Sequence, residues 1–148
     1  MDELKHSIGV IGGGTMGRGI IQLLAQAGHE VLCHDAIPGA ARKAADHAAD
    51  MLRRGVAKGR MTQARCDLSV SRIRACESLA DLAACDILIE AVIEDLGVKV
   101  DLFRALEGLV AKSAILATNT SSLPVSAIAG ACQAPERVAG LHFSIRCL

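Results

Sequence analysis

Aromatic residues are almost absent from this sequence, which has no Trp, no Tyr and two Phe in 148 residues. Because hydrophobic residues still make up 51% of the chain, the core must be built from aliphatic side chains. The formal net charge is +0, so no basic field favours nucleic acid as a partner. No apolar run approaches the roughly 20 residues of a membrane span, and the polar first residues do not resemble a secretory signal. We therefore expect one cytoplasmic domain that binds neither nucleic acid nor membrane.

A cysteine framework is also lacking. The six cysteines are scattered and show no C-x-x-C spacing, which is typical of reduced, mostly buried thiols in a cytosolic protein. His47 with Asp46 and Asp50 has the composition of a metal cluster. The solvated face of an alanine-rich helix explains these three residues more simply, so no metal site is predicted.

Residues 8–35, in contrast, have the layout of a dinucleotide-binding site. A short apolar strand runs into a G-x-G-x-x-G turn, and an amphipathic helix follows, closed by Gly28. The first glycine of this motif permits the tight turn, the second lets the backbone approach a pyrophosphate, and the third lets the helix pack on the strand. The helix points free N–H groups and a partial positive charge at the phosphates. The cofactor-binding residues predicted here are Gly12, Gly14, Thr15, Met16, Gly17 and Asp35.

Asp35 decides which dinucleotide is expected. It ends the next strand about 20 residues after the glycines, where an acid accepts hydrogen bonds from the ribose 2′-OH. The same carboxylate would repel a 2′-phosphate, so NAD is favoured over NADP. The alternative is a glycine-rich surface turn with an incidental Asp.

The rest of the chain alternates predicted helices and strands. Helices are expected at 38–58, after a cap at Thr62, at 79–83, at 98–110 and from Pro124, and strands at 68–73, 86–93, 115–118 and 138–143. This alternation predicts an α/β fold with a Rossmann-type, doubly wound, mostly parallel sheet. The whole chain, 1–148, is interpreted as one NAD-binding domain.

Four segments resemble one family in order and spacing. Gly9–Ile20, Ile89–Leu96, Ala117–Leu123 and Pro135–Phe143 are similar to the N-terminal NAD-binding domain of the 3-hydroxyacyl-CoA dehydrogenases, of the 3-hydroxybutyryl-CoA dehydrogenase type. The resemblance implies an oxidoreductase that transfers hydride between NAD and C3 of a 3-hydroxyacyl-CoA. Fatty-acid β-oxidation and aromatic-acid degradation both use this reaction.

The resemblance also implies roles for single residues. His142 matches the catalytic base, and a histidine titrates in the range that oxidation of an alcohol requires. Ser121 matches the serine that hydrogen-bonds the reacting oxygen of the substrate, Glu94 a glutamate near the nicotinamide ribose, and Lys99 a lysine near the cofactor. The residues alone leave another interpretation open for each: His142 as a strand-end histidine, Ser121 as part of a helix N-cap, Glu94 as a capping acid and Lys99 as a solvated lysine.

Two further residues complete the predicted site. Asn119 belongs to a polar cluster, 119–122, that follows a predicted strand, which is where α/β sheets place ligands, and it is assigned to the cofactor. Lys58 lies near the family lysine that contacts CoA, although a solvated surface lysine fits equally well. The expected substrate is therefore an acyl-CoA.

The resemblance breaks after Phe143. The family continues His-Phe-Phe-Asn-Pro, whereas this chain reads Ser144-Ile-Arg-Cys-Leu148 after the phenylalanine. The family asparagine, a downstream glutamate that orients the histidine, and a helical C-terminal domain have no counterpart here. Residues 144–148 are therefore interpreted as an aberrant tail on a truncated dehydrogenase. We expect such a chain to be deficient in catalysis, since positioning supplies about 7–11 kcal/mol of barrier lowering, and to self-associate through exposed apolar surface.

A single-base deletion accounts for this ending. The coding sequence CAC-TTC-TTC-AAT-CCG-GTG-CCT-GTG-A encodes His-Phe-Phe-Asn-Pro-Val-Pro-Val. Removing one T from the second TTC gives CAC-TTC-TCA-ATC-CGG-TGC-CTG-TGA, which encodes the observed His142–Leu148 and then a stop codon. Sequencing the DNA beyond the Phe143 codon tests this expectation, because family-like sequence must follow in the shifted frame.

Two other functions remain open from the sequence. A non-catalytic NAD-binding remnant would bind nucleotide without turnover. Another β-hydroxyacid dehydrogenase, such as the hydroxyisobutyrate type, would share the glycine motif but use a catalytic lysine in a later domain. The run 118–123 and the segment 140–143 favour the 3-hydroxyacyl-CoA family, and fold alone would not decide.

Overall fold

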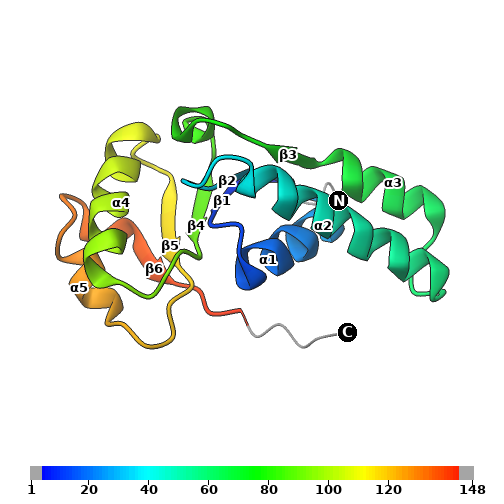
Figure 1. The fold of residues 1–148 in the computed structure, drawn as a ribbon. Coiled ribbons are helices and arrows are strands. Elements are labelled where there is room, and N and C mark those ends of the chain that lie inside the picture. The colour runs from blue at the N-terminus through cyan, green and yellow to red at the C-terminus, as the bar shows by residue number, and fades with distance from the viewer. Residues whose placement is uncertain (1–4, 144–148) are drawn as a thin grey trace.

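The computed structural model describes residues 5–143, and the predicted aberrant tail lies outside these residues. Six strands form one sheet in the order β3-β2-β1-β4-β5-β6, and every neighbouring pair is parallel. This is the strand order of a Rossmann fold, and it confirms the predicted fold class (Figure 1).

The strands are β1 (Ser7–Ile11), β2 (Glu30–His34), β3 (Ile73–Ala75), β4 (Ile87–Glu90), β5 (Ile115–Thr118) and β6 (Val138–Gly140). The α-helices are α1 (Thr15–Gln26), α2 (Ala40–Ala57), α3 (Gln63–Ser71), α4 (Leu96–Leu109) and α5 (Val125–Ala129), and short 3₁₀ turns span Leu79–Leu82 and Pro135–Arg137. Figure 1 shows α1 and α2 on one side of the strands and α4 and α5 on the other.

Each face of the sheet has its own aliphatic core. Ile8 and Val10 of β1 pack with α1 and with the small buried side chains of α2, while Ile11 packs with α4 and α5. The alternation along β1 follows the period of two residues in a strand. Phe103, on α4, is the aromatic side chain that is fully buried. The predicted aliphatic core is thus confirmed.

Several predicted elements were wrong in type or length. Residues 68–73 were expected as a strand, but residues up to Ser71 belong to α3, which begins after its N-cap Thr62. The Thr62 side chain accepts a hydrogen bond from Arg65 N–H. The strand predicted at 86–93 ends at Glu90, whose carboxylate accepts a hydrogen bond from Val92 N–H and turns the chain out of the sheet. The last strand is also shorter than predicted and ends at Gly140.

The carboxyl ends of four strands meet in register at one edge of the sheet. Glu90 pairs with both Ile11 of β1 and Thr118 of β5, and Thr118 pairs with Gly140 of β6. From β1 to β3 the chain adds strands on one side of β1, and it then returns to add β4 on the other side. The direction in which strands are added therefore reverses between β1 and β4. In open α/β sheets, ligands bind at this kind of crevice.

Among residues 5–143, no helix is both long and apolar enough to cross a membrane. The five cysteines in this range are free thiols with buried side chains, as predicted. Burial raises the pKa of the Cys33 thiol to about 12, which keeps that sulfur protonated and unreactive.

Candidate active site

The glycine turn between β1 and α1 is shaped by two different constraints. Gly12 has a φ of 112°, and a Cβ there would lie 2.4 Å from the carbonyl oxygen of Ala91. A Cβ on Gly17 would lie 1.7 Å from the Gly12 oxygen, whereas a Cβ on Gly14 would meet no atom within 4 Å. The first and third glycines therefore close the turn against the protein, while the second faces open space.

The open space at Gly14 lies over the start of α1. Gly14 is the N-cap of that helix, and no side chain caps it. The free N–H groups of the first turn, at Thr15, Met16 and Gly17, are a ready site for an anion. The turn thus presents what a pyrophosphate requires: room at the backbone and donors aimed at it.

Asp35 lies directly after β2, because the strand ends at His34, one residue earlier than predicted. Its Oδ2 accepts a 2.7 Å hydrogen bond from Gly13 N–H, and its Oδ1 accepts a 2.8 Å bond from Ile37 N–H. These bonds fix the carboxylate beside the glycine turn. Each oxygen retains acceptor capacity for a ribose hydroxyl.

A fully buried ion pair lies beneath the neighbouring strand ends. Lys99 of α4 and Glu90 of β4 are both 0% exposed, and the Lys99 ammonium donates to Glu90 Oε2 at 2.5 Å. The other carboxylate oxygen, Oε1, accepts a 2.6 Å bond from Thr118 Oγ1. The alternative interpretation of Lys99 as a solvated helix residue is therefore wrong.

Glu94 lies above this pair and joins it to the loop after β5. Its Oε1 is 3.1 Å from Lys99 Nζ, and its Oε2 accepts hydrogen bonds from Thr120 Oγ1 at 2.6 Å and Ser122 Oγ at 2.5 Å. The Ser122 and Thr120 hydroxyls, aided by the Lys99 charge, lower the pKa of Glu94 from its ordinary 4.5 to about 2. Glu94 is therefore an anion at neutral pH, in the loop between β4 and α4.

Two alternative interpretations for these loops are excluded by the contacts. Helix α4 is capped by Asp95, which accepts a hydrogen bond from Val98 N–H, and not by Glu94. Helix α5 has Pro124 as its N-cap, and no side chain caps it. The hydroxyls of Thr120 and Ser122 donate hydrogen bonds to Glu94 instead.

Ser121 and His142, the two predicted catalytic residues, are exposed at the same edge. His142 lies two residues past β6, in a segment that is tied to β5 on both sides. Leu141 N–H donates to the Thr118 carbonyl, and Phe143 N–H donates to Asn119 Oδ1, each at 2.9 Å. Within residues 5–143, no hydrogen bond engages the His142 imidazole.

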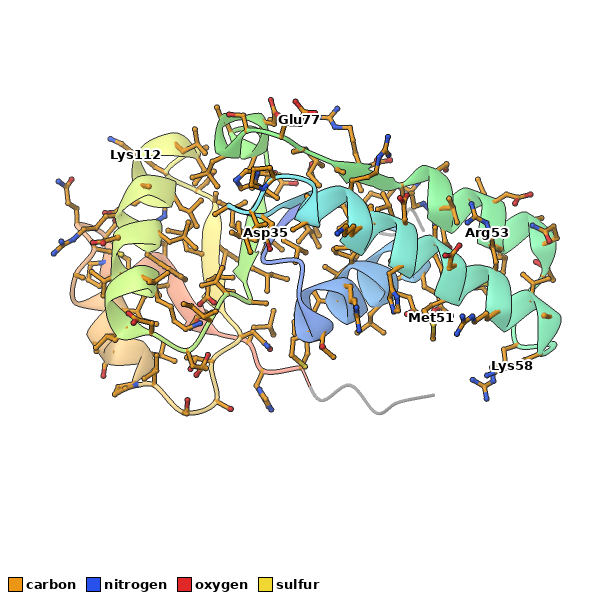
Figure 2. All side chains as sticks on the ribbon, viewed as in Figure 1. Asp35, Met51, Arg53, Lys58, Glu77 and Lys112 are labelled. Carbon is orange, nitrogen blue, oxygen red and sulfur yellow. The ribbon has the colours of Figure 1, made fainter. Side chains whose placement is uncertain are left out.

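Lys58 lies apart from this group. It caps α2, an 18-residue helix that spans about 27 Å, at the end away from Asp35 (Figure 2). With Arg54, Arg60 and Met61 it lines a cavity of about 70 Å³. The structure therefore brings the other predicted site residues to one edge of the sheet and leaves Lys58 at the tip of the α2–α3 pair.

Sequence reasoning gave no role in the site to Glu90, Thr118 or Thr120. All three side chains are buried. One signal for Glu90 was present, since it is the charged residue at the end of the otherwise apolar β4, and a buried charge requires a partner. Thr120 carried a weaker signal as a member of the polar cluster 119–122, and Thr118 carried no comparable one.

Comparison with known proteins agrees with this geometry. The family described as "3-hydroxyacyl-CoA dehydrogenase, NAD binding domain" matches residues 7–145. The chain belongs to this family. That result confirms the resemblance and, at the level of the family, NAD as the cofactor, and it disfavours the hydroxyisobutyrate alternative.

Individual relatives are similar over almost the whole chain but are themselves longer. The chain is 41% identical to 3-hydroxyadipyl-CoA dehydrogenase of Escherichia coli, covering 93% of this chain and 29% of that protein. It is 38% identical to 3-hydroxybutyryl-CoA dehydrogenase of Clostridioides difficile, covering 92% of this chain and 48% of that protein. The crystal structure of FadB2 from M. tuberculosis superposes with a TM-score of 0.90 at 35% identity, covering 97% of this chain and 50% of that one. The chain thus spans about half or less of these relatives.

Proposed function

We propose that this chain supplies the NAD-binding half of an NAD-dependent 3-hydroxyacyl-CoA dehydrogenase. One observation carries the proposal. The glycine turn, Asp35 and side chains that follow β4, β5 and β6 all lie at the same edge of the sheet. NAD, when bound, accepts or supplies the hydride. The protein residues bind it, orient the substrate and move the proton.

The cofactor part of the proposal concerns the turn and Asp35. The open backbone at Gly14 and the uncapped start of α1 suit the pyrophosphate, with Thr15 and Met16 in the first turn. The Asp35 carboxylate suits a free ribose 2′-OH and opposes a 2′-phosphate. Glu94 keeps one lone pair on Oε1 beyond its contact with Lys99, and we assign that oxygen to the nicotinamide ribose. Asn119, whose amide group is uncommitted in the described residues, is assigned to the cofactor as well.

The substrate part concerns Ser121, His142 and Lys58. The Ser121 hydroxyl is proposed to donate to the reacting oxygen at C3, and His142 to take up or return the proton of that oxygen. Lys58, supported by the neighbouring charges of Arg54 and Arg60, is proposed to contact the phosphates of CoA. The buried free thiols fit a reducing, cytoplasmic location.

This chain by itself is proposed to turn over weakly. Ser144-Ile-Arg stands where the family has Phe-Asn-Pro, so the family asparagine that helps to hold the substrate is missing at that position. The exposed His142 without a hydrogen-bond partner among the described residues favours the second candidate function, an NAD-binding remnant without turnover.

One pair of measurements separates the two functions. NADH binding is followed by fluorescence titration, and NADH oxidation is followed with acetoacetyl-CoA as substrate. Binding with slow turnover that is lost in the His142→Ala variant supports the dehydrogenase. Binding with no turnover in either protein supports the remnant, and absence of NADH binding contradicts both.

A further inference from the structure

The residues on either side of Ser121 are held by the same oxygen atom. Thr120 Oγ1 and Ser122 Oγ both donate to Glu94 Oε2, at 2.6 and 2.5 Å. Ser121, between them, is exposed. A carboxylate 26 residues away in the chain therefore fixes the backbone that carries the candidate substrate serine.

Glu94 is itself anchored by buried groups. Its Oε1 contacts the ammonium of Lys99, whose side chain is 1% exposed, and that ammonium also donates to Glu90 Oε2 and to the Val92 carbonyl. The Glu94 side chain is 48% exposed, but its carboxylate is held by this buried ammonium on one oxygen and by the Thr120 and Ser122 hydroxyls on the other. These three contacts make it a fixed acceptor.

The contacts close into a ring. Glu90 binds Lys99, Lys99 binds Glu94, and Glu94 accepts from the Thr120 hydroxyl. The backbone N–H of Thr120 donates to Thr118 Oγ1 at 3.3 Å, and that hydroxyl donates back to Glu90 Oε1. Each bond in such a ring polarises the next. The ring joins the ends of β4 and β5 to the first turn of α4.

We propose that Glu94 is a positioning residue for Ser121, acting through Thr120 and Ser122, in addition to the cofactor contact assigned above. The inference rests on the proposed function in one respect, namely that Ser121 is the residue that meets the substrate. Because the rotamer preference of a side chain depends on its backbone φ and ψ angles, the backbone held by Glu94 is expected to give the exposed Ser121 side chain one preferred rotamer. The cofactor side and the substrate side of the site then both depend on the Glu94 carboxylate.

The test measures the Ser121 side chain directly, in the full chain without cofactor. When Ser121 holds one staggered rotamer, the NMR couplings between Hα and its two Hβ protons take limiting values, either one large and one small or both small. When rotamers interconvert, both couplings move to intermediate values. Limiting couplings are expected in the unaltered protein. Intermediate couplings are expected in Glu94→Gln and in the double variant Thr120→Val/Ser122→Ala, because these lose the carboxylate or the hydroxyl donors.

The matched control keeps the hydroxyls. Thr120→Ser/Ser122→Thr retains both donors and should preserve the limiting couplings of the unaltered protein, which a general loss of stability would not explain. Urea unfolding of each variant shows whether it is folded. Because Thr120 is buried and Ser122 is exposed, Ser122→Ala alone serves if the double variant does not fold, with partial averaging expected.

Two outcomes overturn the proposal: intermediate couplings in the unaltered protein, or limiting couplings that persist in Glu94→Gln and in every folded variant that lacks hydroxyls. An NADH titration of the same proteins separates this result from the function. If Ser122→Ala loses rotamer order at Ser121 while its NADH affinity stays within about twofold of the unaltered protein, the result supports positioning by Glu94. No NADH binding by the unaltered protein contradicts the proposed function but leaves the rotamer result standing.

Discussion

The side-chain carbonyl of Asn119 accepts a 2.9 Å hydrogen bond from the backbone N–H of Phe143. Asn119 directly follows β5, and Phe143 lies three residues beyond β6. His142, the candidate base, is next to the donor of this bond. The asparagine assigned to the cofactor from the sequence thus also fixes the segment that carries the histidine.

Replacing Asn119 should loosen that segment. Asn119→Ala removes the acceptor, and a hydrogen bond of this kind contributes about 1 kcal/mol, a factor of about five in an equilibrium. The exchange rate of the Phe143 amide hydrogen is expected to rise about fivefold in that variant. Asn119→Asp keeps an acceptor oxygen and should preserve the protection. Equal exchange in the alanine variant would show that the bond does not hold the segment.

Lys99 should be essential for stability because it neutralises a buried charge. Removing one partner of a buried ion pair costs about 3–5 kcal/mol, whereas removing both costs far less. We expect Lys99→Met to lower the free energy of unfolding by about that amount, and Lys99→Met/Glu90→Gln to recover much of it. Urea unfolding measures both. A double variant no more stable than Lys99→Met would contradict this account of Glu90.

Replacement by alanine should have different effects on stability and NADH affinity at the first and at the second glycine of the motif. Gly12→Ala places a Cβ against the Ala91 carbonyl at a φ of 112° and should destabilise the protein by about 2–4 kcal/mol. Gly14→Ala meets no protein atom, so its stability should stay within about 0.5 kcal/mol. NADH affinity should nevertheless fall about tenfold, since the methyl group occupies the proposed pyrophosphate space. Thermal unfolding and NADH titration of the two variants give the comparison, and unchanged NADH affinity in Gly14→Ala would contradict the placement.

Glu94 should stabilise the fold only where it is ionised. Its pKa is lowered from 4.5 to about 2 in the folded state by Ser122, Thr120 and Lys99. The stabilisation is therefore complete above about pH 4.5 and is lost as the pH falls toward about 2. The difference in unfolding free energy between the unaltered protein and Glu94→Gln should be largest near pH 6 and shrink by about pH 3. If the difference in unfolding free energy is constant with pH, the stabilisation by Glu94 comes from the shape of its side chain and not from its charge.

The sequence predicted the parts of this site that local pattern determines. The glycine turn, the helix after it and the acid after β2 lie within 28 residues, and their roles follow from turn geometry and helix electrostatics. The resemblance added Glu94, Ser121 and His142, which the sheet register then brings to one edge.

The contacts among the loops could not be predicted in the same way. The bonds from Glu94 to Thr120 and Ser122 join residues 26 and 28 positions apart, and they depend on the pairing of β4 with β5. Helix α4 shows the same limit. The spacing of its apolar residues places Val98 and Leu102 on one face, and Leu102 packs against the core, but Val98 is 42% exposed. Lys99 and Phe103 are buried, and the charge of Lys99 is compensated there by Glu90 of β4.

The central claim, an NAD site built on the glycine turn and Asp35, is tested most directly by titrating the chain with NADH and, separately, with NADPH. The account predicts that NADH binds at least about tenfold more tightly, because the Asp35 carboxylate repels a 2′-phosphate, and that Asp35→Asn, which keeps the shape and removes the charge, narrows the difference. Equal affinity for the two nucleotides in the unaltered protein, or binding of neither, would contradict it.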